Sequence, residues 1–349
     1  MGDRVPKNWV MKGSEQVVGS GSLRTLAVDL MRLGMGVVNA RRAWRELGGE
    51  VDWVYERSAA LQSLGWIFSR RGVPWILEVN ALYSRESEAD RKGTVLKGLA
   101  RWLEVRAYRE CDVLVCVSEP LKDLVVRDWG VSPEKVMVVL NGVDTEFFSP
   151  ELYKPRRVFE GFTVGFVGTL FPWQGLDLLL ETLSELRAEG LNLSLVVVGD
   201  GSEREGLEAQ ARRLGISSNV AFAGRVPQQE VPRWISGFDV GYSGHVRLKL
   251  GEMYHSPLKL YEYMAMAKPA VASAFEDARR TVREGETGFL FRAGDRADLR
   301  RALIKAYESR GRVPEMGRKA REHILKYHGW RARVEAIIEG VERILDLRR

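Results

Sequence analysis

The sequence predicts an α/β protein made of two doubly wound, Rossmann-like domains. Short apolar runs alternate with segments of helical periodicity along most of the chain, which is typical of βαβ units and a parallel sheet. The apolar runs are continuous rather than alternating, as strands covered on both faces require. The length of 349 residues corresponds to about two domains.

The second half of the chain shows this rhythm most clearly. Its apolar runs predict strands at Phe162–Val167, Leu193–Val198, Val220–Ala223, Asp239–Ser243 and Pro269–Ser273. Helical periodicity predicts helices at Gly175–Ala188, Glu203–Leu214, Gln228–Ser236, Ser256–Ala267, Asp295–Ser309, Pro314–Tyr327 and Trp330–Leu347. This order implies a parallel sheet, and ligands of such sheets bind beyond the carboxyl ends of the strands.

The first half repeats the pattern with fewer strands. Strands are predicted at Val51–Tyr55, Val73–Val79, Asp112–Val117 and Lys135–Leu140. Helices are predicted at Leu23–Leu33, Asn39–Leu47, Ala59–Arg70, Thr94–Arg109 and Pro120–Trp129. The polar segment Glu151–Arg157 reads as a linker, so we expect a short first domain over residues 1–150 and a second domain from residue 151. We expect the ligand-binding site in the cleft between these two domains.

Composition excludes several classes of protein. Hydrophobic residues make up 45% and charged residues 29%, and no apolar run approaches the roughly 18 residues of a membrane span. Residues 1–18 lack the apolar core of a signal peptide, and Pro6 stands where a myristoylation signal has Ser or Thr. The net charge of +6 is mild and diffuse, which argues against a nucleic-acid partner.

Metal and disulfide chemistry are also not expected. Cys111 and Cys116 lie in one apolar run at an odd spacing, which places them on opposite faces of a strand. They should not bridge, so a reducing, cytoplasmic compartment is expected. The histidines and cysteines show no zinc spacing, and no Asp-x-Asp pair is present to hold a metal with a diphosphate.

The most informative segment is the helix start at Ser256-Pro-Leu-Lys. Ser256 can cap the helix, and Pro257 suits its first turn. The free amides of Leu258 and Lys259 would then form an anion site, with the charge of Lys259 added. Glu262 lies one turn later on the same face as Lys259. An ordinary surface Lys–Glu pair remains the alternative for this segment taken alone.

Together with its surroundings, this segment resembles the donor-binding half of family 4 glycosyltransferases, which have the GT-B fold. Six pieces carry the resemblance in order and spacing: Gly165–Leu179, Val198–Ser202, Val220–Val226, Phe238–Val240, Ser256–Ala265 and Gly285–Phe291. The resemblance covers roughly residues 110–349. It implies transfer of a sugar, with retention, from a nucleotide-diphosphate sugar to an acceptor. It also implies that residues 330–349 form a helix that crosses back toward the first domain.

The family's donor-binding positions can be carried over residue by residue. By this resemblance, Glu262 binds the donor ribose, and the helix start at Ser256, Leu258 and Lys259 binds the diphosphate. The loop with Gly168 and Thr169 approaches the diphosphate, and Arg225 and Val226 contact the base. A nucleoside diphosphate that leaves with growing negative charge can be stabilised by such amides and cations, so no metal or other cofactor is expected.

Several positions depart from the family pattern. Tyr254 stands where the first Glu of the Glu-x(7)-Glu motif falls, and Thr169 and Gln174 replace two cations usual at the diphosphate. Lys259 is expected to substitute for them and to point at the leaving group, with Arg247 or Lys249 assisting. In the first domain, Asn80 stands where the family has a His, with Glu78 beside it; both are candidate catalytic groups.

The start of the chain leaves other functions open. No convincing strand precedes the Gly-rich stretch at residues 18–24, so the family's first strand is not evident. A weakly catalytic homologue that binds a nucleotide sugar or pairs with a catalytic subunit is therefore an alternative to an active enzyme. A dinucleotide oxidoreductase ranks lowest, because Gly199-Asp-Gly-Ser-Glu-Arg lacks the third glycine of that fingerprint.

The acceptor also stays open. The basic, amphipathic stretch from Arg91 to Arg109 can lie on an anionic bilayer near a lipid-linked acceptor, at the inner face of the membrane. It can equally pack on its own sheet with a solvated basic face.

Overall fold

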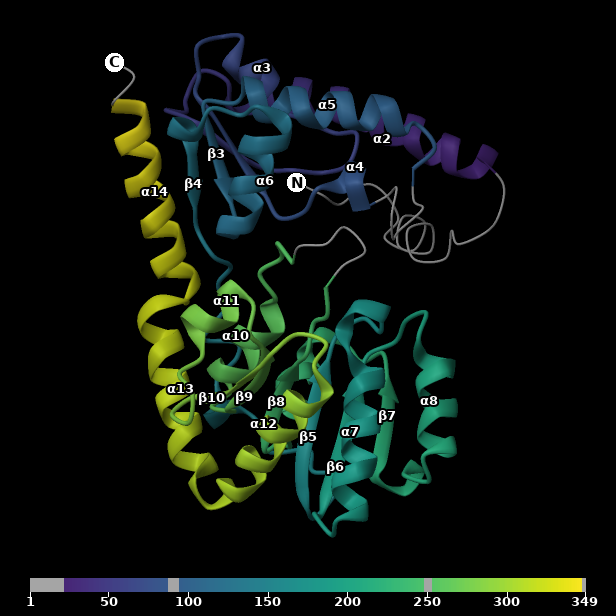
Figure 1. Cartoon of the computed structure of the whole chain (residues 1–349). Coiled ribbons are helices and arrows are strands. Elements are labelled where there is room, and N and C mark those ends of the chain that lie inside the picture. Colours follow the sequence, from purple (N-terminus) through teal and green to yellow (C-terminus); the bar gives the residue numbers. More distant parts are fainter. Residues whose placement is uncertain (1–21, 87–93, 248–252, 347–349) are drawn as a thin grey trace. The chain divides into compact units, whose positions relative to one another are not determined.

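The computed structural model of the chain describes residues 22–86, 94–247 and 253–346. The chain divides into two compact units (Figure 1). Unit 1 comprises Met1–Val139, Lys249–His255 and Ala336–Arg349, and unit 2 comprises Leu140–Leu248 and Ser256–Glu335. The first division therefore lies at Val139, before the boundary expected near residue 150.

Unit 1 is built on a parallel sheet of four strands in the order β1-β2-β3-β4. The strands are β1 (Val54–Arg57), β2 (Trp75–Val79), β3 (Val113–Cys116) and β4 (Val136–Val138). Its helices are α2 (Ser22–Leu47), α3 (Trp66–Ser69), α4 (Tyr83–Glu86), α5 (Lys97–Glu110), α6 (Glu119–Trp129) and the 3-10 turn η2 (Pro133–Lys135). The second half of α14 (Trp330–Asp346) also belongs to it, and Val341 and Ile344 pack against Ile76 and Val113 of the sheet.

Unit 1 departs from the sequence prediction at four helices, one of which, α4, was not predicted. The two helices expected before Leu47 are one continuous helix, α2. Only Trp66–Ser69 of the expected helix Ala59–Arg70 is helical, because the buried carboxylate of Glu56 accepts hydrogen bonds from the amides of Leu64 and Gly65 and holds the preceding loop.

The helix α5 begins at Lys97 rather than at Thr94. The carboxylate of Asp29, buried on α2, accepts hydrogen bonds from the amides of Val95 (2.8 Å) and Leu96 (3.1 Å). Asp29 therefore supplies from another helix the cap that the local sequence lacks.

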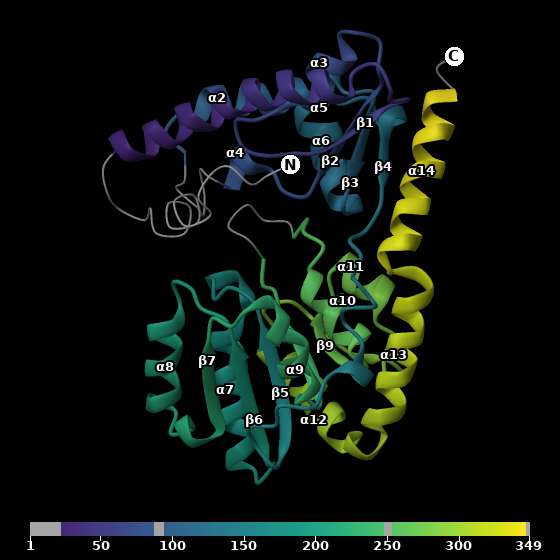
Figure 2. The same ribbon diagram turned by 180° about the vertical axis from the view of Figure 1, so that it is seen from behind.

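Unit 2 is built on a parallel sheet of six strands in the order β10-β9-β8-β5-β6-β7 (Figure 1, and from behind in Figure 2). The strands are β5 (Phe162–Val167), β6 (Leu193–Val198), β7 (Val220–Gly224), β8 (Val240–Ser243), β9 (Ala270–Ser273) and β10 (Gly288–Phe291). Its helices are α7 (Leu176–Ala188), α8 (Arg204–Arg213), α9 (Val231–Ser236), α10 (Leu258–Ala265), α11 (Glu276–Thr281), α12 (Arg296–Glu308), α13 (Val313–Tyr327) and the first half of α14. Short 3-10 turns are η3 (Pro150–Leu152), η4 (Pro172–Gln174), η5 (Ser217–Asn219), η6 (Gln228–Glu230) and η7 (Arg310–Arg312).

The five strands predicted for this half are all present, and β10 and α11 were not predicted. Gly288 and Phe289 pair with β9 at the edge of the sheet, and the flanking turn residues hide this short strand from periodicity. The strands β5 and β6 are almost wholly buried, as their continuous apolar character requires. The fold is thus two Rossmann-like units, with fewer strands in the first.

Two further expectations concern the membrane and the cysteines. In the described residues, none of the helices is both long and apolar enough to cross a bilayer. Cys111 and Cys116 are free and buried, and burial raises the pKa of the Cys116 thiol.

Candidate active site

Two glycine loops meet at the carboxyl edge of the unit 2 sheet. Gly168 follows β5 with φ 146°, and Gly199 follows β6 with φ 138°. A Cβ atom on Gly199 would lie 1.9 Å from the carbonyl oxygen of Gly168, so the two backbones approach as only glycine allows. The amide of Gly168 donates to the carbonyl of Val198 at 3.0 Å.

The helix α10 begins with backbone amides that lack a capping side chain. Pro257 occupies the N-cap position with β-type dihedral angles and makes no side-chain cap. Among the residues that the structure describes, none accepts a hydrogen bond from the amides of Leu258 or Lys259. Such amides at a helix N-terminus form a site for an anion.

Ser256 does not cap this helix, contrary to the expectation from sequence. Its hydroxyl instead accepts a hydrogen bond from the amide of Asn141 (3.2 Å) and lies 3.2 Å from the hydroxyl of Tyr261. The hydroxyl of Tyr261 also donates to the carboxylate of Asp277, which is buried. Ser256 therefore joins a buried polar network, and the cap position falls to Pro257.

The side chain of Lys259 reaches back to the carboxyl end of β5. Its Nζ atom lies 4.4 Å from the ring centroid of Phe166 and donates to the side-chain oxygen of Gln174. A Cβ atom on Gly168 would lie 3.6 Å from the same Nζ atom. Burial lowers the pKa of Lys259 to about 7, although the nearby carboxylate of Glu262 opposes the shift.

Glu262 lies one turn after Lys259 and is half-buried. Burial raises the pKa of Glu262 to about 7, and the charge of Lys259 opposes that shift. The structure thus gathers Gly168, Gln174, Lys259 and Glu262 around the first turns of α10, and two of them carry strongly shifted pKa values.

The other residues expected to bind the sugar donor differ in their exposure to solvent. Thr169 is half-buried beside Gly168, and Leu258 is exposed at the start of α10. Val226 packs against the apolar cluster under α10, and Arg225 is exposed beside it. Lys249 lies outside the described residues, whereas Arg247 is described and exposed.

Tyr254 belongs to unit 1, whereas this group belongs to unit 2. Its buried hydroxyl donates to Oε1 of Glu86 at 3.0 Å, and Nε2 of His255 lies 2.8 Å from the same oxygen. The hydroxyl of Ser118 donates to the carbonyl of Tyr254 at 2.6 Å. Sequence reasoning missed Glu86, because no local pattern marks a buried carboxylate in a four-residue helix.

Glu78 and Asn80 form a second polar cluster in unit 1, at the carboxyl ends of β1 and β2. The carboxylate of Glu78 accepts hydrogen bonds from the hydroxyl of Tyr55 and from the side-chain amide of Asn80. The Nε atom of Arg57 lies 3.4 Å from the same carboxylate. Burial raises the pKa of Tyr55, and the charge of Glu78 adds to the shift.

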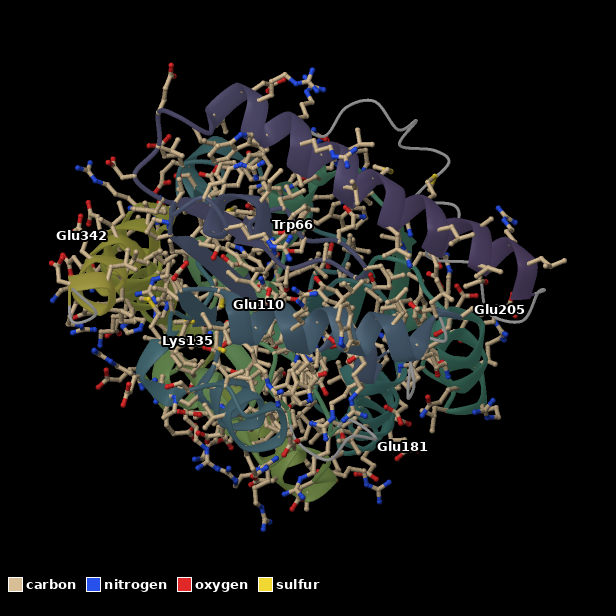
Figure 3. The ribbon with its side chains drawn as sticks, turned by 90° about the horizontal axis from the view of Figure 1, so that it is seen from above. Trp66, Glu110, Lys135, Glu181, Glu205 and Glu342 are labelled. Atoms are coloured by element: carbon tan, nitrogen blue, oxygen red, sulfur yellow. The ribbon has the colours of Figure 1, made fainter. Side chains whose placement is uncertain are left out.

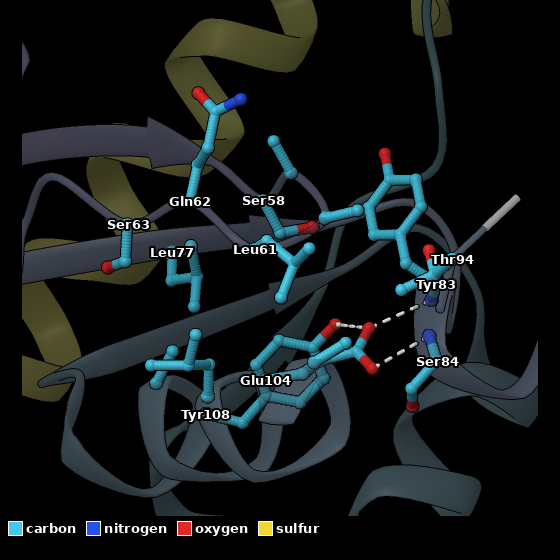
Figure 4. Close-up of a pocket in the computed structure, with 15 residues that line it drawn as sticks. Ser58, Leu61, Gln62, Ser63, Leu77, Tyr83, Ser84, Thr94, Glu104 and Tyr108 are labelled. Atoms are coloured by element: carbon cyan, nitrogen blue, oxygen red, sulfur yellow. Dashed lines mark hydrogen bonds between the residues drawn. The ribbon is translucent and has the colours of Figure 1, made fainter. Parts of the chain in front are cut away.

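Unit 1 also contains a pocket between the loop after β1, β2 and the inner side of α5 (Figure 4). Its empty volume is about 460 Å³, part of it open to solvent. At one end the carboxylate of Glu104 accepts hydrogen bonds from the amides of Tyr83 (2.8 Å) and Ser84 (3.0 Å) and from the hydroxyl of Tyr108 (3.1 Å). Leu61, which lines it, has φ 60°, a conformation uncommon for leucine.

Comparison with known families identifies the chain. The model of Glycosyl transferases group 1 matches residues 154–323, and the model of Glycosyltransferase Family 4 matches residues 17–147. The chain belongs to glycosyltransferase family 4. The expected resemblance is therefore confirmed, and this family 4 enzyme is a retaining glycosyltransferase that takes its sugar from a nucleotide-diphosphate donor.

Curated relatives of this glycosyltransferase are named for different sugar-transfer reactions. D-inositol 3-phosphate glycosyltransferase 2 of Catenulispora acidiphila is 27% identical, over 86% of this chain and 73% of the relative. Alpha-D-kanosaminyltransferase of Streptomyces kanamyceticus is 24% identical, over 79% of this chain and 73% of the relative. These names support sugar transfer and leave the acceptor unspecified.

Solved structures confirm the GT-B fold. A glycosyltransferase from Rickettsia africae superimposes with a TM-score of 0.66 at 14% identity, covering 94% of this chain and 83% of that one. Anabaena HepE, solved in complex with UDP and glucose, has a TM-score of 0.66 at 18% identity, covering 88% of this chain and 83% of that one.

Proposed function

We propose that this glycosyltransferase transfers a hexose from a UDP-sugar, and that the first turn of α10 and the ammonium group of Lys259 bind the departing diphosphate without a metal. The observation that carries the proposal is the position of Lys259. Its Nζ atom lies over Phe166 at the carboxyl end of β5, and the helix that carries Lys259 begins with two amides that donate to none of the described residues.

The physical argument concerns the charge that develops as the glycosidic bond to the diphosphate breaks. Amides fixed at a helix start and a desolvated cation stabilise that charge without reorganisation. In the described residues, none of the His, Cys, Asp and Glu side chains form a group of three that could hold a metal ion. Lys259 is thus the cation best placed to take the role that a metal has in other transferases.

Gln174 and Glu262 complete the proposed donor site. Gln174 stands where the family has a cation, and its side-chain oxygen holds the ammonium group of Lys259 in place. Glu262, with a pKa raised to about 7 by burial, would regain a partner when it accepts hydrogen bonds from the ribose hydroxyls. UDP is the nucleotide of choice because the similar HepE structure holds it.

A binding experiment tests this site. Thermal shift with UDP, GDP, ADP and TDP identifies the base, and calorimetry then measures the affinity of UDP for Glu262→Ala and for Glu205→Ala, an exposed control on α8. We expect Glu262→Ala to weaken UDP binding roughly ten- to a hundredfold, because a charge-assisted hydrogen bond contributes about 1.5–3 kcal/mol. Unchanged affinity in a folded Glu262→Ala protein would remove Glu262 from the site. UDP binding without turnover of any UDP-sugar would favour the weakly catalytic homologue instead.

For the acceptor, we propose a lipid-linked molecule met at the inner face of a membrane, with Glu78 and Asn80 near the reacting hydroxyl. The polar cluster around Glu78 offers a carboxylate that can accept the proton of an acceptor hydroxyl, and α5 carries an exposed basic and apolar face. Radiolabelled donor incubated with a bacterial lipid extract and with soluble sugars distinguishes the two acceptor classes. Label found only in soluble products would contradict the lipid-linked acceptor.

A further inference from the structure

Half of the exposed large hydrophobic side chains in the described part of the chain gather on two neighbouring helices. Of sixteen such residues, eight lie on α2 or on α5 and the turn before it. They are Leu23, Leu30, Val37, Val38, Leu47, Val95, Leu99 and Trp102. Figures 1 and 3 show α2 and α5 side by side on the outer side of unit 1.

The exposed residues of α2 form one stripe along the helix. Leu23, Leu30 and Val37 recur at helical spacing and are 80%, 56% and 43% exposed, with Val38 (64%) beside them. The buried residues Asp29 and Ala40 lie on the side of the helix next to this stripe, since Ala40 is three residues after Val37. The stripe therefore runs along the exposed side of α2, beside the side that is buried in unit 1.

The helix α5 repeats this arrangement. Val95, Leu99 and Trp102 are spaced by four and three residues, and Trp102 is 54% exposed. The opposite face holds the buried Ala100 and Tyr108. Because Asp29 of α2 binds the amides at the start of α5, the two helices are fixed relative to each other within the unit.

The charges around both stripes are strongly one-sided. Nine basic residues lie on the two helices: Arg24, Arg32, Arg41, Arg42, Arg45, Lys97, Arg101, Arg106 and Arg109. Of the four acidic residues on these helices, Asp29 is paired with Arg32, Glu46 with Arg42 and Glu110 with Arg106, and Glu104 is turned inward. Arg109 donates to the carbonyl of Trp129, so the excess of basic charge rests on Arg24, Arg41, Arg45, Lys97 and Arg101. An apolar stripe flanked by unbalanced arginines is complementary to an anionic bilayer.

We propose that α2 and α5 form a membrane-docking face that binds anionic phospholipid, with the apolar stripes at the acyl boundary and the arginines at the phosphates. This face deepens the proposed function, since it would bring the enzyme to a lipid-linked acceptor. It does not depend on turnover, so the two can fail separately.

Vesicle sedimentation of the full chain tests the face. We expect the protein to bind vesicles of phosphatidylcholine mixed with phosphatidylglycerol, to bind pure phosphatidylcholine far less, and to be released by salt. The pair Arg41→Gln with Arg101→Gln should lower the partition coefficient roughly thirtyfold, because each surface cation contributes about fivefold. The pair Leu30→Gln with Trp102→Gln should lower it at least about tenfold.

A matched control pair lies on unit 2. Leu152 and Leu325 are 67% and 49% exposed, and changing both to Gln should leave vesicle binding unchanged. Circular dichroism checks that each variant is folded, and transfer to a soluble acceptor is measured on the same preparations. The proposal is overturned if the wild type ignores anionic vesicles, or if both test pairs bind as well as the control. A dimer that Leu30→Gln with Trp102→Gln dissociates, in a protein that binds no vesicles, would show instead that the face joins two copies.

Discussion

Replacing Lys259 by methionine removes the one charge that the proposed donor site places at the leaving group. Methionine keeps most of the apolar stem of Lys259, whose Nζ atom lies over the ring of Phe166, so the fold should persist. Because burial lowers the pKa of Lys259 to about 7, the ammonium is costly to the empty protein, and Lys259→Met should be at least as stable as the wild type. A loss of activity therefore could not be ascribed to unfolding.

The expected loss follows from the bond that disappears. A hydrogen bond from an ammonium group to a phosphate oxygen contributes about 1.5–3 kcal/mol, which corresponds to roughly a ten- to 150-fold fall in kcat/KM. UDP affinity should also fall, while affinity for uridine should not, since uridine has no phosphate to lose. Lys259→Arg should recover part of the activity, because a planar fork does not reproduce a point charge.

Steady-state transfer assays and calorimetry measure these quantities. Lys268→Met is the matched control, since Lys268 is another half-buried lysine, just beyond the opposite end of α10, and burial also lowers its pKa. The reasoning is refuted if Lys259→Met keeps its kcat/KM, or if Lys259→Met weakens uridine and UDP binding equally. In that case Arg247 becomes the next candidate cation.

Four further outcomes are expected. Excess EDTA should leave turnover unchanged, and loss of activity restored by manganese would defeat the metal-independent mechanism. UDP binding at slightly alkaline pH should take up a proton. Lys259, with a pKa of about 7, is mostly neutral at that pH, and the phosphate charge of bound UDP raises its pKa. Calorimetry in buffers of different ionisation enthalpy detects this proton uptake. Burial raises the pKa of Asp277 from 3.8 to about 6, so between pH 3.8 and about pH 6 the folded state binds more protons than the unfolded state. The free energy of unfolding should therefore fall as the pH rises through this range. Urea titrations should show that Asp277→Asn abolishes this loss of stability. Gly199→Ala should lower the melting temperature sharply because its Cβ would meet the carbonyl oxygen of Gly168, whereas Gly206→Ala, with open space on α8, should raise stability by about 0.5–1 kcal/mol.

The sequence by itself determined the order of most strands and helices along the chain and the placement of Lys259 and Glu262 on one side of a helix. Continuous apolar runs predicted β5 and β6 because burial on both faces leaves a local mark. Helical spacing placed Lys259 and Glu262 on one side of α10, since residues three apart share a face. The family motifs then supplied the chemistry.

The tertiary structure alone decided which partner each polar group takes. Ser256 bonds to Asn141 and Tyr261 instead of capping α10, and Tyr254 bonds to Glu86 within unit 1. Asp29 sets the start of α5 from far along the chain. Local periodicity reports how deeply a residue is buried, whereas these contacts join residues more than sixty positions apart or depend on the path of the backbone between elements. No spacing rule encodes such contacts, so the arrangement of the site was fixed only when the chain had folded.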